Sequence, residues 1–346
     1  MAIRKTSEQI KEDILSQLKE EPLSTKRLSE NVGSNWSTIN SYLNELKEEK
    51  KVREIISSDN IKFYVRADDP VYYNLPFPKE VRNQSIYLLS RILEEWKEKH
   101  KTYPPKTTAQ KIAVEVIRKC NLDLPILDFH YGKVTCVNVE PGQKLEEIYD
   151  VKTPDNHLII IKCIKEVIPN HHEKSWKERR KQYKDEKMDF YRIKEKISYG
   201  FNNKTNIKEM IDKFYILSMN FPLKLKDFYS EFHDFISVST VLLDIDIKED
   251  EMEKNNMMKI KETFSSLWDL LTTDSYFNDA EKFISPPKRD LFDQIKRLNI
   301  NFKKMTYENM FSELKSELIG LDEIKLKMPQ GKDSENIQNL ILENLD

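Results

Sequence analysis

The chain has 346 residues, of which 38% are hydrophobic and 34% charged, with a formal net charge of −2. This length exceeds what one compact domain usually needs, and the apolar fraction is sufficient for well-formed cores. The slightly acidic balance excludes a generally basic coat for nucleic acid, so any such contact must be local.

Cysteine usage and hydropathy indicate the compartment. Cys120, Cys136 and Cys163 are far apart and odd in number, which argues against a disulfide framework and for a reducing environment. The N-terminus lacks the apolar core of a signal peptide. The most apolar run, residues 157–168, is interrupted by lysines and is too short to span a bilayer. We therefore expect a soluble cytoplasmic protein without membrane contact.

Glycine is scarce, with six residues in the whole chain and no cluster among them. Dinucleotide-binding fingerprints and phosphate-binding P-loops both need clustered glycines for close backbone approach. No GxSxG nucleophile elbow is present either. Several large enzyme classes are thereby excluded. The preferred interpretation is not an enzyme, and we assign no catalytic residue and no cofactor.

Residues 6–67 form the clearest unit, which begins with two short helices. Apolar residues at four-residue spacing predict a helix in "SEQIKEDILSQLKE", which Pro22 ends. Ser24 can cap a second helix, "TKRLSENV", and Gly33 can close it. A tight turn is therefore expected directly after the second helix.

A third helix and a hairpin complete this unit. Asn35 can cap the helix, on which Ile39, Leu43 and Leu46 form an apolar stripe. "KVREIIS" and "IKFYVRA" are rich in β-branched and aromatic residues and predict two short strands. The polar turn "SDN" at 58–60 joins them into a hairpin.

Three helices followed by a hairpin resemble the winged helix-turn-helix domains of prokaryotic transcription regulators. The resemblance covers about residues 6–67, with "STKRLSENVG" as positioning helix and turn, "SNWSTINSYLNELKEEKKV" as recognition helix and "REIISSDNIKFYV" as wing. Ser34 stands where such domains usually carry an aliphatic residue. The resemblance implies binding of double-stranded DNA, with helix 35–47 in the major groove and the 57–62 wing on the backbone or minor groove.

The expected recognition helix presents short polar side chains opposite its apolar stripe. Consecutive residues are about 100° apart around a helix, so the spacing of these residues places them on the other side from the stripe. Asn can pair bidentately with adenine, and Ser can donate or accept at several bases. Trp36 lies at the edge of the stripe, where its ring either packs on the second helix or meets a thymine methyl or the sugar backbone. The candidate base-reading residues are Asn35, Trp36, Ser37, Asn40, Ser41 and Asn44.

Phosphate contacts are expected from the residues around this helix. Residues 1–67 hold 12 Lys or Arg and 11 Asp or Glu, and this net charge of +1 predicts modest affinity for a single domain. A homodimer would double the contacts and read a two-fold site, so we expect a homodimer. The candidate phosphate-contacting and wing residues are Lys26, Arg27, Lys50, Lys51, Ser58, Asn60 and Lys62.

The rest of the chain is persistently helical in pattern. We predict a helical connector domain over 68–142, a helical bundle for dimerisation or sensing over 143–325, and a polar tail over 326–346. Within these, residues 132–139 are either an isolated strand or an extended loop, and a helix is capped by Thr306 and closed by Gly320. The predicted fold class is mainly α, with an N-terminal winged helix followed by a large all-helical region.

Residues 173–199 are predicted to form one long charged helix with a narrow stripe at seven-residue spacing. The stripe consists of Trp176, Tyr183, Phe190 and Ile197. Residues 168–204 hold 11 Lys or Arg against 6 Asp or Glu, and the stretch 174–196 is the most basic part of the chain. It is either a second phosphate-contacting surface, for RNA or flanking DNA, or a solvated face whose charges are explained by Lys–Glu pairs at four-residue spacing.

Metal binding is not expected. His171 and His172 are adjacent, so on a helix they point about 100° apart and cannot face one metal as an i, i+4 pair would. Neither HExxH nor CxxC accompanies them.

The predicted function is sequence-specific binding of double-stranded DNA, by a transcription regulator acting as a dimer. In this regulator the helical region either forms the dimer or binds a protein partner. One alternative is a protein-interaction module, in which the repurposed winged helix binds another protein in a chromosome- or polymerase-associated assembly. The lack of arginine in the recognition helix favours this alternative. The other is an enzyme acting on nucleic acid, which requires acidic or histidine side chains to converge in the folded C-terminal region.

Overall fold

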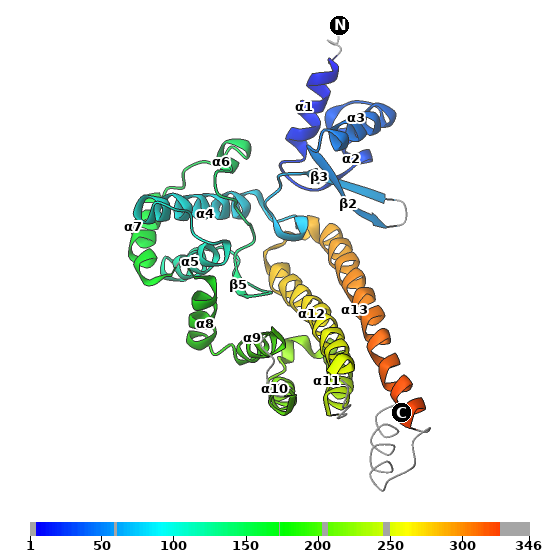
Figure 1. The fold of residues 1–346 in the computed structure, drawn as a ribbon. Helices are drawn as coiled ribbons and strands as arrows, with labels where there is room; N and C mark the ends of the chain where they lie inside the picture. Colours follow the sequence, from blue (N-terminus) through cyan, green and yellow to red (C-terminus); the bar gives the residue numbers. More distant parts are fainter. Residues whose placement is uncertain (1–4, 59–60, 173, 203–206, 245–249, 326–346) are drawn as a thin grey trace. The chain divides into compact units, whose positions relative to one another are not determined.

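The computed structural model describes residues 5–58, 61–172, 174–202, 207–244 and 250–325. The fold is mainly helical with few short strands, which confirms the predicted class at that level (Figure 1). The predicted polar tail, 326–346, lies outside the described residues. Among the described helices, none is long and apolar enough to cross a membrane.

The chain divides into two compact units, and neither is continuous in sequence. The first takes the described residues of Met1–Arg192 and Asp269–Lys303, and the second takes those of Ile193–Trp268 and Lys304–Asp346. α12 (Asp250–Ala280) and α13 (Arg289–Lys325) each contribute to both units. The domain boundaries predicted at 67, 142 and 325 stay predictions.

The N-terminal part of the first unit combines short helices with a small antiparallel sheet of strand order β1–β3–β2 (Figure 1). Its elements are α1 (Ser7–Gln17), β1 (Leu23–Ser24), α2 (Thr25–Val32), α3 (Trp36–Glu48), β2 (Val52–Ser58) and β3 (Ile61–Arg66). One apolar cluster joins the inner faces of the helices to the sheet, and Ile14, Leu28 and Leu43 are fully buried in it. Three helices and the antiparallel β2–β3 pair lie where the sequence predicts helices and strands, and the winged helix-turn-helix assignment stays a prediction.

The helix boundaries in this part follow from local capping. Ser24 Oγ accepts a hydrogen bond from the Arg27 N–H at 3.4 Å, and Asn35 Oδ1 accepts one from the Thr38 N–H at 2.8 Å. Gly33 ends α2 at φ +70°, in the left-handed region that glycine enters without steric cost. One boundary was predicted wrongly, because α1 ends at Gln17 and not at Pro22.

The remainder of the first unit is a helical layer with one small hairpin. Its elements are α4 (Lys79–His100), α5 (Lys106–Lys119), β4 (Leu127–Phe129), β5 (Gly132–Val134), α6 (Leu145–Ile148), α7 (His157–Val167) and α8 (Ser175–Asp185). Trp96, Ile112 and Ile164 are buried in its core. Tyr276 and Phe292, from α12 and α13, join the same cluster.

The hairpin corrects the prediction for residues 132–139. Only Gly132–Val134 is a strand, and it pairs antiparallel with β4, with Phe129 opposite Gly132. The prediction missed β4 because its three residues, "LDF", are too few to show an alternating pattern.

The long helix predicted over 173–199 is also corrected, because it is two helices. α8 ends at Asp185 and α9 (Asp189–Asn202) begins three residues beyond the cap residue Glu186. Lys187 adopts φ +52°, and the Met188 N–H donates to the Tyr183 carbonyl at 2.9 Å. This is the Schellman arrangement that stops a helix, formed here without glycine.

A third correction concerns the C-terminal helix. α13 runs without a break from Arg289 to Lys325. Thr306 therefore lies inside the helix and is not its cap, and the helix does not end at Gly320. Both residue types are frequent at helix ends, but a long packed helix overrides such local preferences.

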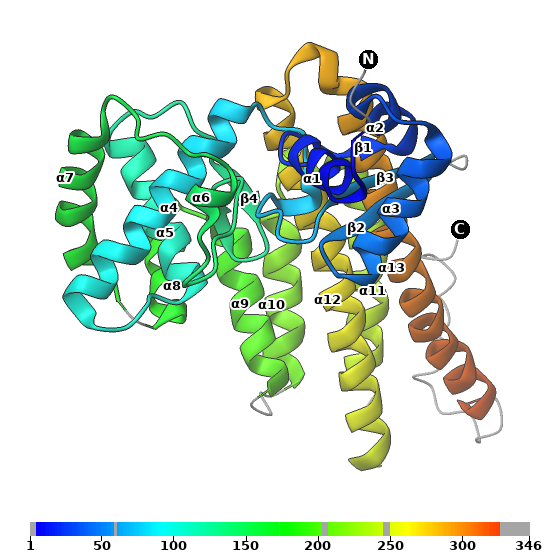
Figure 2. The same cartoon turned by 90° about the horizontal axis from the view of Figure 1, so that it is seen from above.

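The second unit is a helical bundle with an aromatic core. α10 (Ile207–Met219) and α11 (Tyr229–Asp244) pack against each other. α11 also lies against α12 (Figure 2). The rings of Phe235 and Phe264 are stacked with centroids 5.7 Å apart, and Phe214 meets Phe264 edge-on at 5.6 Å. Such pairs stabilise the bundle beyond the apolar area that they bury.

Candidate nucleic-acid interface

The α3 helix has a buried apolar face and an exposed polar face. Ile39, Leu43 and Leu46 are fully buried in the N-terminal core. The opposite face carries Ser37, Asn40, Ser41 and Asn44, of which Asn40 is half-buried and the others exposed. None of these four side chains hydrogen-bonds another described residue, so their polar groups are available to an external partner.

Two further predicted base-reading residues, Asn35 and Trp36, lie at the start of α3. They differ from the four polar-face residues in what they leave available to a partner. Asn35 uses its side-chain oxygen to cap the helix, so only its amide group is left for a partner. Trp36 is 57% exposed, which leaves most of its ring available for an external contact. The N-terminal turn of α3 therefore offers one amide donor and one large aromatic surface.

The same face of α3 becomes acidic towards its C-terminal end. Glu48 is exposed and lies on the side of Ser41 and Asn44, seven and four residues earlier. Glu45, at the edge of this face, is paired with Lys11 at 2.8 Å. A DNA phosphate would be repelled at this end, so the neutral N-terminal half is the part suited to a groove.

The predicted phosphate-contacting residues fall into two groups. Lys26 and Lys50 are exposed and make no ion pair with any described residue. The other cations are each paired with a nearby carboxylate: Arg27 with Glu30 at 3.6 Å, Lys51 with Glu49 at 2.7 Å and Lys62 with Glu54 at 3.5 Å. Exposed pairs of this kind are weak, about 0–1 kcal/mol, so a phosphate can replace the carboxylate.

The tip of the hairpin is only partly described. Asn60 lies outside the described residues, and Ser58 is described as the last residue of β2 without its side chain. The predicted wing contacts of these two residues stay predictions.

The chain was compared with protein-family models, with curated proteins and with solved structures. None of them matches it. The candidate interface is accordingly defined by its own residues: the neutral polar face of α3 and the cations beside it.

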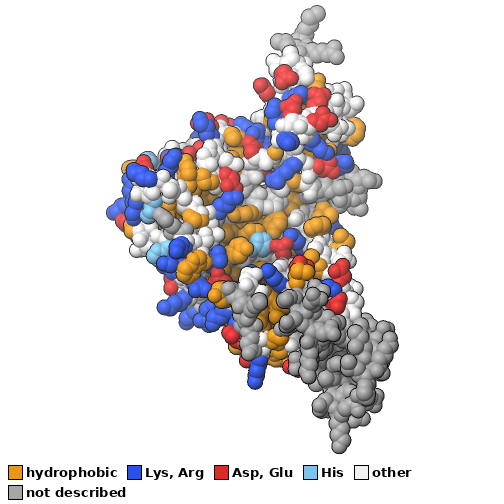
Figure 3. Space-filling view, in the orientation of Figure 1, with side chains coloured by type: hydrophobic (Ala, Val, Ile, Leu, Met, Phe, Trp, Pro, Cys, Tyr) orange, Lys and Arg blue, Asp and Glu red, His pale blue; other side chains and the backbone are white. Residues whose placement is uncertain are grey.

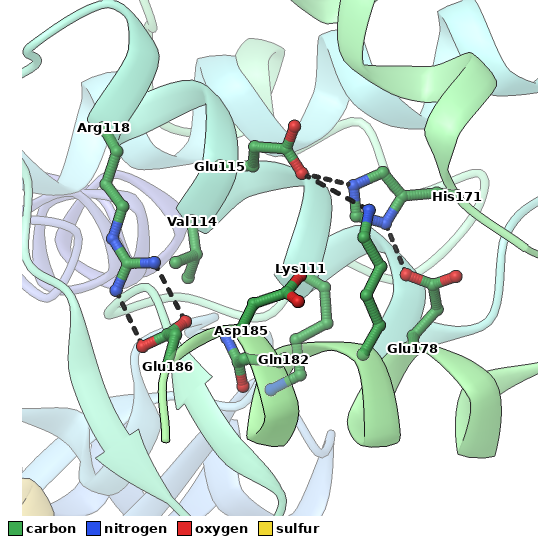
Figure 4. A pocket seen from close by; sticks show the side chains of 10 residues that line it. Lys111, Val114, Glu115, Arg118, His171, Glu178, Gln182, Asp185 and Glu186 are labelled. Atoms are coloured by element: carbon green, nitrogen blue, oxygen red, sulfur yellow. Dashed lines mark hydrogen bonds and ion pairs between the residues drawn. The ribbon is translucent and has the colours of Figure 1, made fainter. Parts of the chain in front are cut away.

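A second polar site, which the sequence did not predict, lies between α5 and α8 (Figure 4). It is a pocket of about 290 Å³ lined mainly by charged side chains. His171, which precedes α8, is 3% exposed there and bonds two carboxylates: Nδ1 meets Glu178 Oε2 at 2.5 Å and Nε2 meets Glu115 Oε2 at 2.9 Å. The other oxygen of Glu178 accepts the His172 N–H at 2.6 Å.

These contacts change the acidity of His171. Burial alone lowers the pKa of its imidazole, but the hydrogen bonds with Glu115 and Glu178 and the Glu178 charge raise this pKa above its ordinary value. Burial likewise opposes ionisation of Glu178, yet the contact with His171 holds the pKa of its carboxyl below the usual range. Both shifts favour the ion pair of a protonated His171 with an ionised Glu178, and the bonds of His171 to Glu178 and Glu115 tie α8 to α5.

On the side of the pocket away from His171, lining residues bond the β4–β5 hairpin and fix its position. Arg118 donates two hydrogen bonds of 2.9 Å to the Glu186 carboxylate, which also pairs with Lys133 at 3.1 Å. Lys111 Nζ donates to the carbonyls of Tyr131 and Lys133 at 2.8 Å each. Burial lowers the pKa of Lys111 to about 7.

This pocket brings histidine and carboxylates together, as the enzyme alternative requires, but their contacts are mostly internal. Neither a hydroxyl nor a thiol is among the residues that line it. Among the described residues, no group of three or more His, Cys, Asp or Glu is arranged to hold a metal ion. The arrangement is suited to hold α5, α8 and the hairpin in register.

The charge of His171 makes a testable contribution to stability. Because the pKa of His171 is higher in the folded than in the unfolded protein, protonation of its imidazole stabilises the fold. This stabilisation is complete below the unfolded pKa, near 6.5, and is lost as pH rises through the folded pKa. His171→Gln should therefore lower the free energy of unfolding more at pH 6 than at pH 9, by about 1–2 kcal/mol, since hydrogen bonds to charged groups contribute about 1.5–3 kcal/mol. Urea unfolding followed by circular dichroism measures this difference.

His157→Gln is the control, because His157 forms no ion pair with a described residue. Its cost at pH 6 should stay within about 0.5 kcal/mol, as is usual for substitutions away from such contacts. An equal cost of His171→Gln at pH 6 and pH 9 would show that the imidazole is neutral in the folded protein.

Proposed function

We propose that residues 6–67 are a winged helix-turn-helix domain and that the protein binds double-stranded DNA through it, as a transcription regulator. The order α1, α2, α3 and hairpin, with β1 completing the sheet, supports this assignment. The observation that carries the proposal is the polar face of α3, which lies opposite a fully buried apolar face and has its hydrogen-bonding groups unused.

On this proposal the N-terminal half of α3 enters the major groove. Asn40 pairs with an adenine, and Ser37 and Ser41 bond neighbouring base edges. Lys26 and Lys50 bind phosphates, and the β2–β3 hairpin lies along the backbone or minor groove. These contacts place the specific part of the interface on α3 and the sequence-independent part around it.

The weak local charge requires a second copy of the domain. With few cations free to meet phosphates, one domain gains little from counterion release. A homodimer places two α3 helices on a two-fold site one helical turn apart. The helical bundle of the second unit is the proposed source of this dimer contact.

The test is fluorescence anisotropy of the full-length protein with a pool of labelled genomic duplexes at about 50 and 200 mM salt. Binding should weaken steeply with salt and favour a few duplexes. Asn40→Ala should reduce this preference roughly 10-fold, since a bidentate base contact contributes about 1–3 kcal/mol. Glu48→Gln, which removes a negative charge from the same face, should tighten binding to every duplex.

Two results would overturn the proposal. One is binding no tighter than roughly 10⁻⁴ M at low salt, which is the weak end of non-specific association. The other is equal binding by the wild-type, Asn40→Ala and Glu48→Gln proteins. In either case α3, with Trp36 exposed, is better explained as a surface for a protein partner.

A further inference from the structure

The outward face of α8 is basic, because Glu178 and the cap residue Glu186 are held in contacts on the inner side of the helix. Glu178 is 1% exposed and is held by His171. Glu186, at the end of the helix, is held by Arg118 and Lys133. Neither of these two carboxylates pairs with a lysine of α8.

The exposed side chains of residues 174–187 are therefore mostly Lys and Arg. Figure 3 shows Lys and Arg side chains over α8. The exposed residues that form this basic face are Lys174, Lys177, Arg180, Lys184 and Lys187. Asp185 is the exposed acidic residue among the described residues 174–187, so the face keeps a strong positive charge despite the acidic chain.

Two exposed aromatic rings are in contact with cations of α8. Trp176 is 43% exposed, with the Arg180 guanidinium 5.0 Å and Lys177 Nζ 5.7 Å from its ring centroid. Tyr131, on the hairpin turn, is 51% exposed and has the Arg179 guanidinium 5.0 Å from its ring centroid. These cation–π contacts orient the rings, while a large part of each ring stays accessible to solvent.

We infer that this α8 face binds single-stranded nucleic acid. The cations attract the sugar–phosphate backbone, and Trp176 and Tyr131 offer flat surfaces on which unpaired bases stack. Guanidinium groups that lie on the rings extend these stacking surfaces. A duplex keeps its bases stacked inside and cannot use exposed rings in this way, so the combination of charge and aromatic surface favours a single strand.

The α5–α8 pocket supports this assignment by fixing the two stacking residues relative to each other. Lys111 and Gln182 hold the hairpin turn: Lys111 bonds the Tyr131 carbonyl at 2.8 Å, and Gln182 Oε1 accepts the Lys133 N–H at 3.0 Å. Since Gln182 belongs to α8, Tyr131 and Trp176 are carried by elements that are bonded together. A pre-formed surface loses less entropy when it binds.

The experiment uses the full-length protein and fluorescein-labelled 15-nucleotide oligo(dT), oligo(dA) and oligo(U), at about 50 and 200 mM salt. Trp176→Ala should weaken binding about 10-fold, as stacking on one aromatic side chain contributes about 1–3 kcal/mol per base. Trp176→Phe should restore most of the affinity because it keeps a ring. Arg180→Glu should weaken binding further and reduce its dependence on salt.

Lys162→Glu is the matched charge control, since Lys162 is exposed on α7 and forms no ion pair with a described residue. The inference is overturned if Lys162→Glu weakens binding as much as Arg180→Glu, if Trp176→Ala has no effect, or if poly-glutamate displaces the oligonucleotides as well as unlabelled oligo(dT) does. Asn40→Ala should leave single-strand binding unchanged, so this inference and the proposed duplex binding can fail separately.

Discussion

Replacing Gly132 by alanine is expected to destabilise the first unit by about 2–5 kcal/mol. Gly132 adopts φ +88°, and a Cβ added there would collide with Gln182 Oε1 and lie 3.1 Å from Tyr183 Cε1 and 3.3 Å from Lys111 Nζ. The left-handed backbone costs an alanine roughly 1–2 kcal/mol, and overpacking adds about 1–3 kcal/mol. Because Gln182 holds the hairpin and Lys111 is buried, these neighbours cannot move away freely.

Gly142→Ala separates the two contributions. Gly142 has a similar φ, +81°, but nothing lies within 4 Å of an added Cβ. This control should therefore show the backbone cost alone, about 1–2 kcal/mol. Urea unfolding of the two variants measures both values, and equal losses would mean that the space around Gly132 is larger than the structure indicates.

Leu43→Ala is expected to lower the free energy of unfolding of the N-terminal part by about 2–5 kcal/mol, the usual cost of truncating a fully buried leucine. Leu43 is completely buried in the cluster that joins α3 to α1, α2 and the sheet. Since the same helix carries the candidate base-reading face, duplex binding should weaken together with stability. Hydrogen exchange of the α3 amides measures the local loss.

The matched control is Leu158→Ala in α7, where the leucine is 73% exposed. Surface substitutions usually change stability by less than about 0.5 kcal/mol, and α3 should exchange as in the wild type. Unchanged α3 protection in Leu43→Ala would contradict the described packing of the N-terminal core.

The N-terminal elements could be predicted because their signals are local. Ser24, Gly33 and Asn35 act on residues within a few positions of themselves, and the apolar stripe of α3 is visible in its spacing alone. The polar face follows from the same geometry. Helical spacing also places Glu48 on that face, although the prediction did not include its negative charge.

The features that were missed depend on residues far apart in sequence. Glu115 and Glu178 meet at His171 only because α5 packs against α8, and no spacing rule connects them. The break at Lys187 was hidden because lysine occupies a backbone conformation that usually signals glycine. Contacts with other elements set these features, so local patterns do not reveal them.

The division of each unit between separate stretches of the chain has a consequence for biosynthesis. The core side chains of the N-terminal part all come from residues 10–64, so that core can assemble as soon as this stretch leaves the ribosome. The larger core of the first unit includes Tyr276, Phe277 and Phe292. Translation proceeds at about 5–20 residues per second. These residues therefore leave the ribosome on the order of ten seconds after α8. During that interval the apolar surface that they will cover stays exposed on the nascent chain, which makes it a natural place for a chaperone to act.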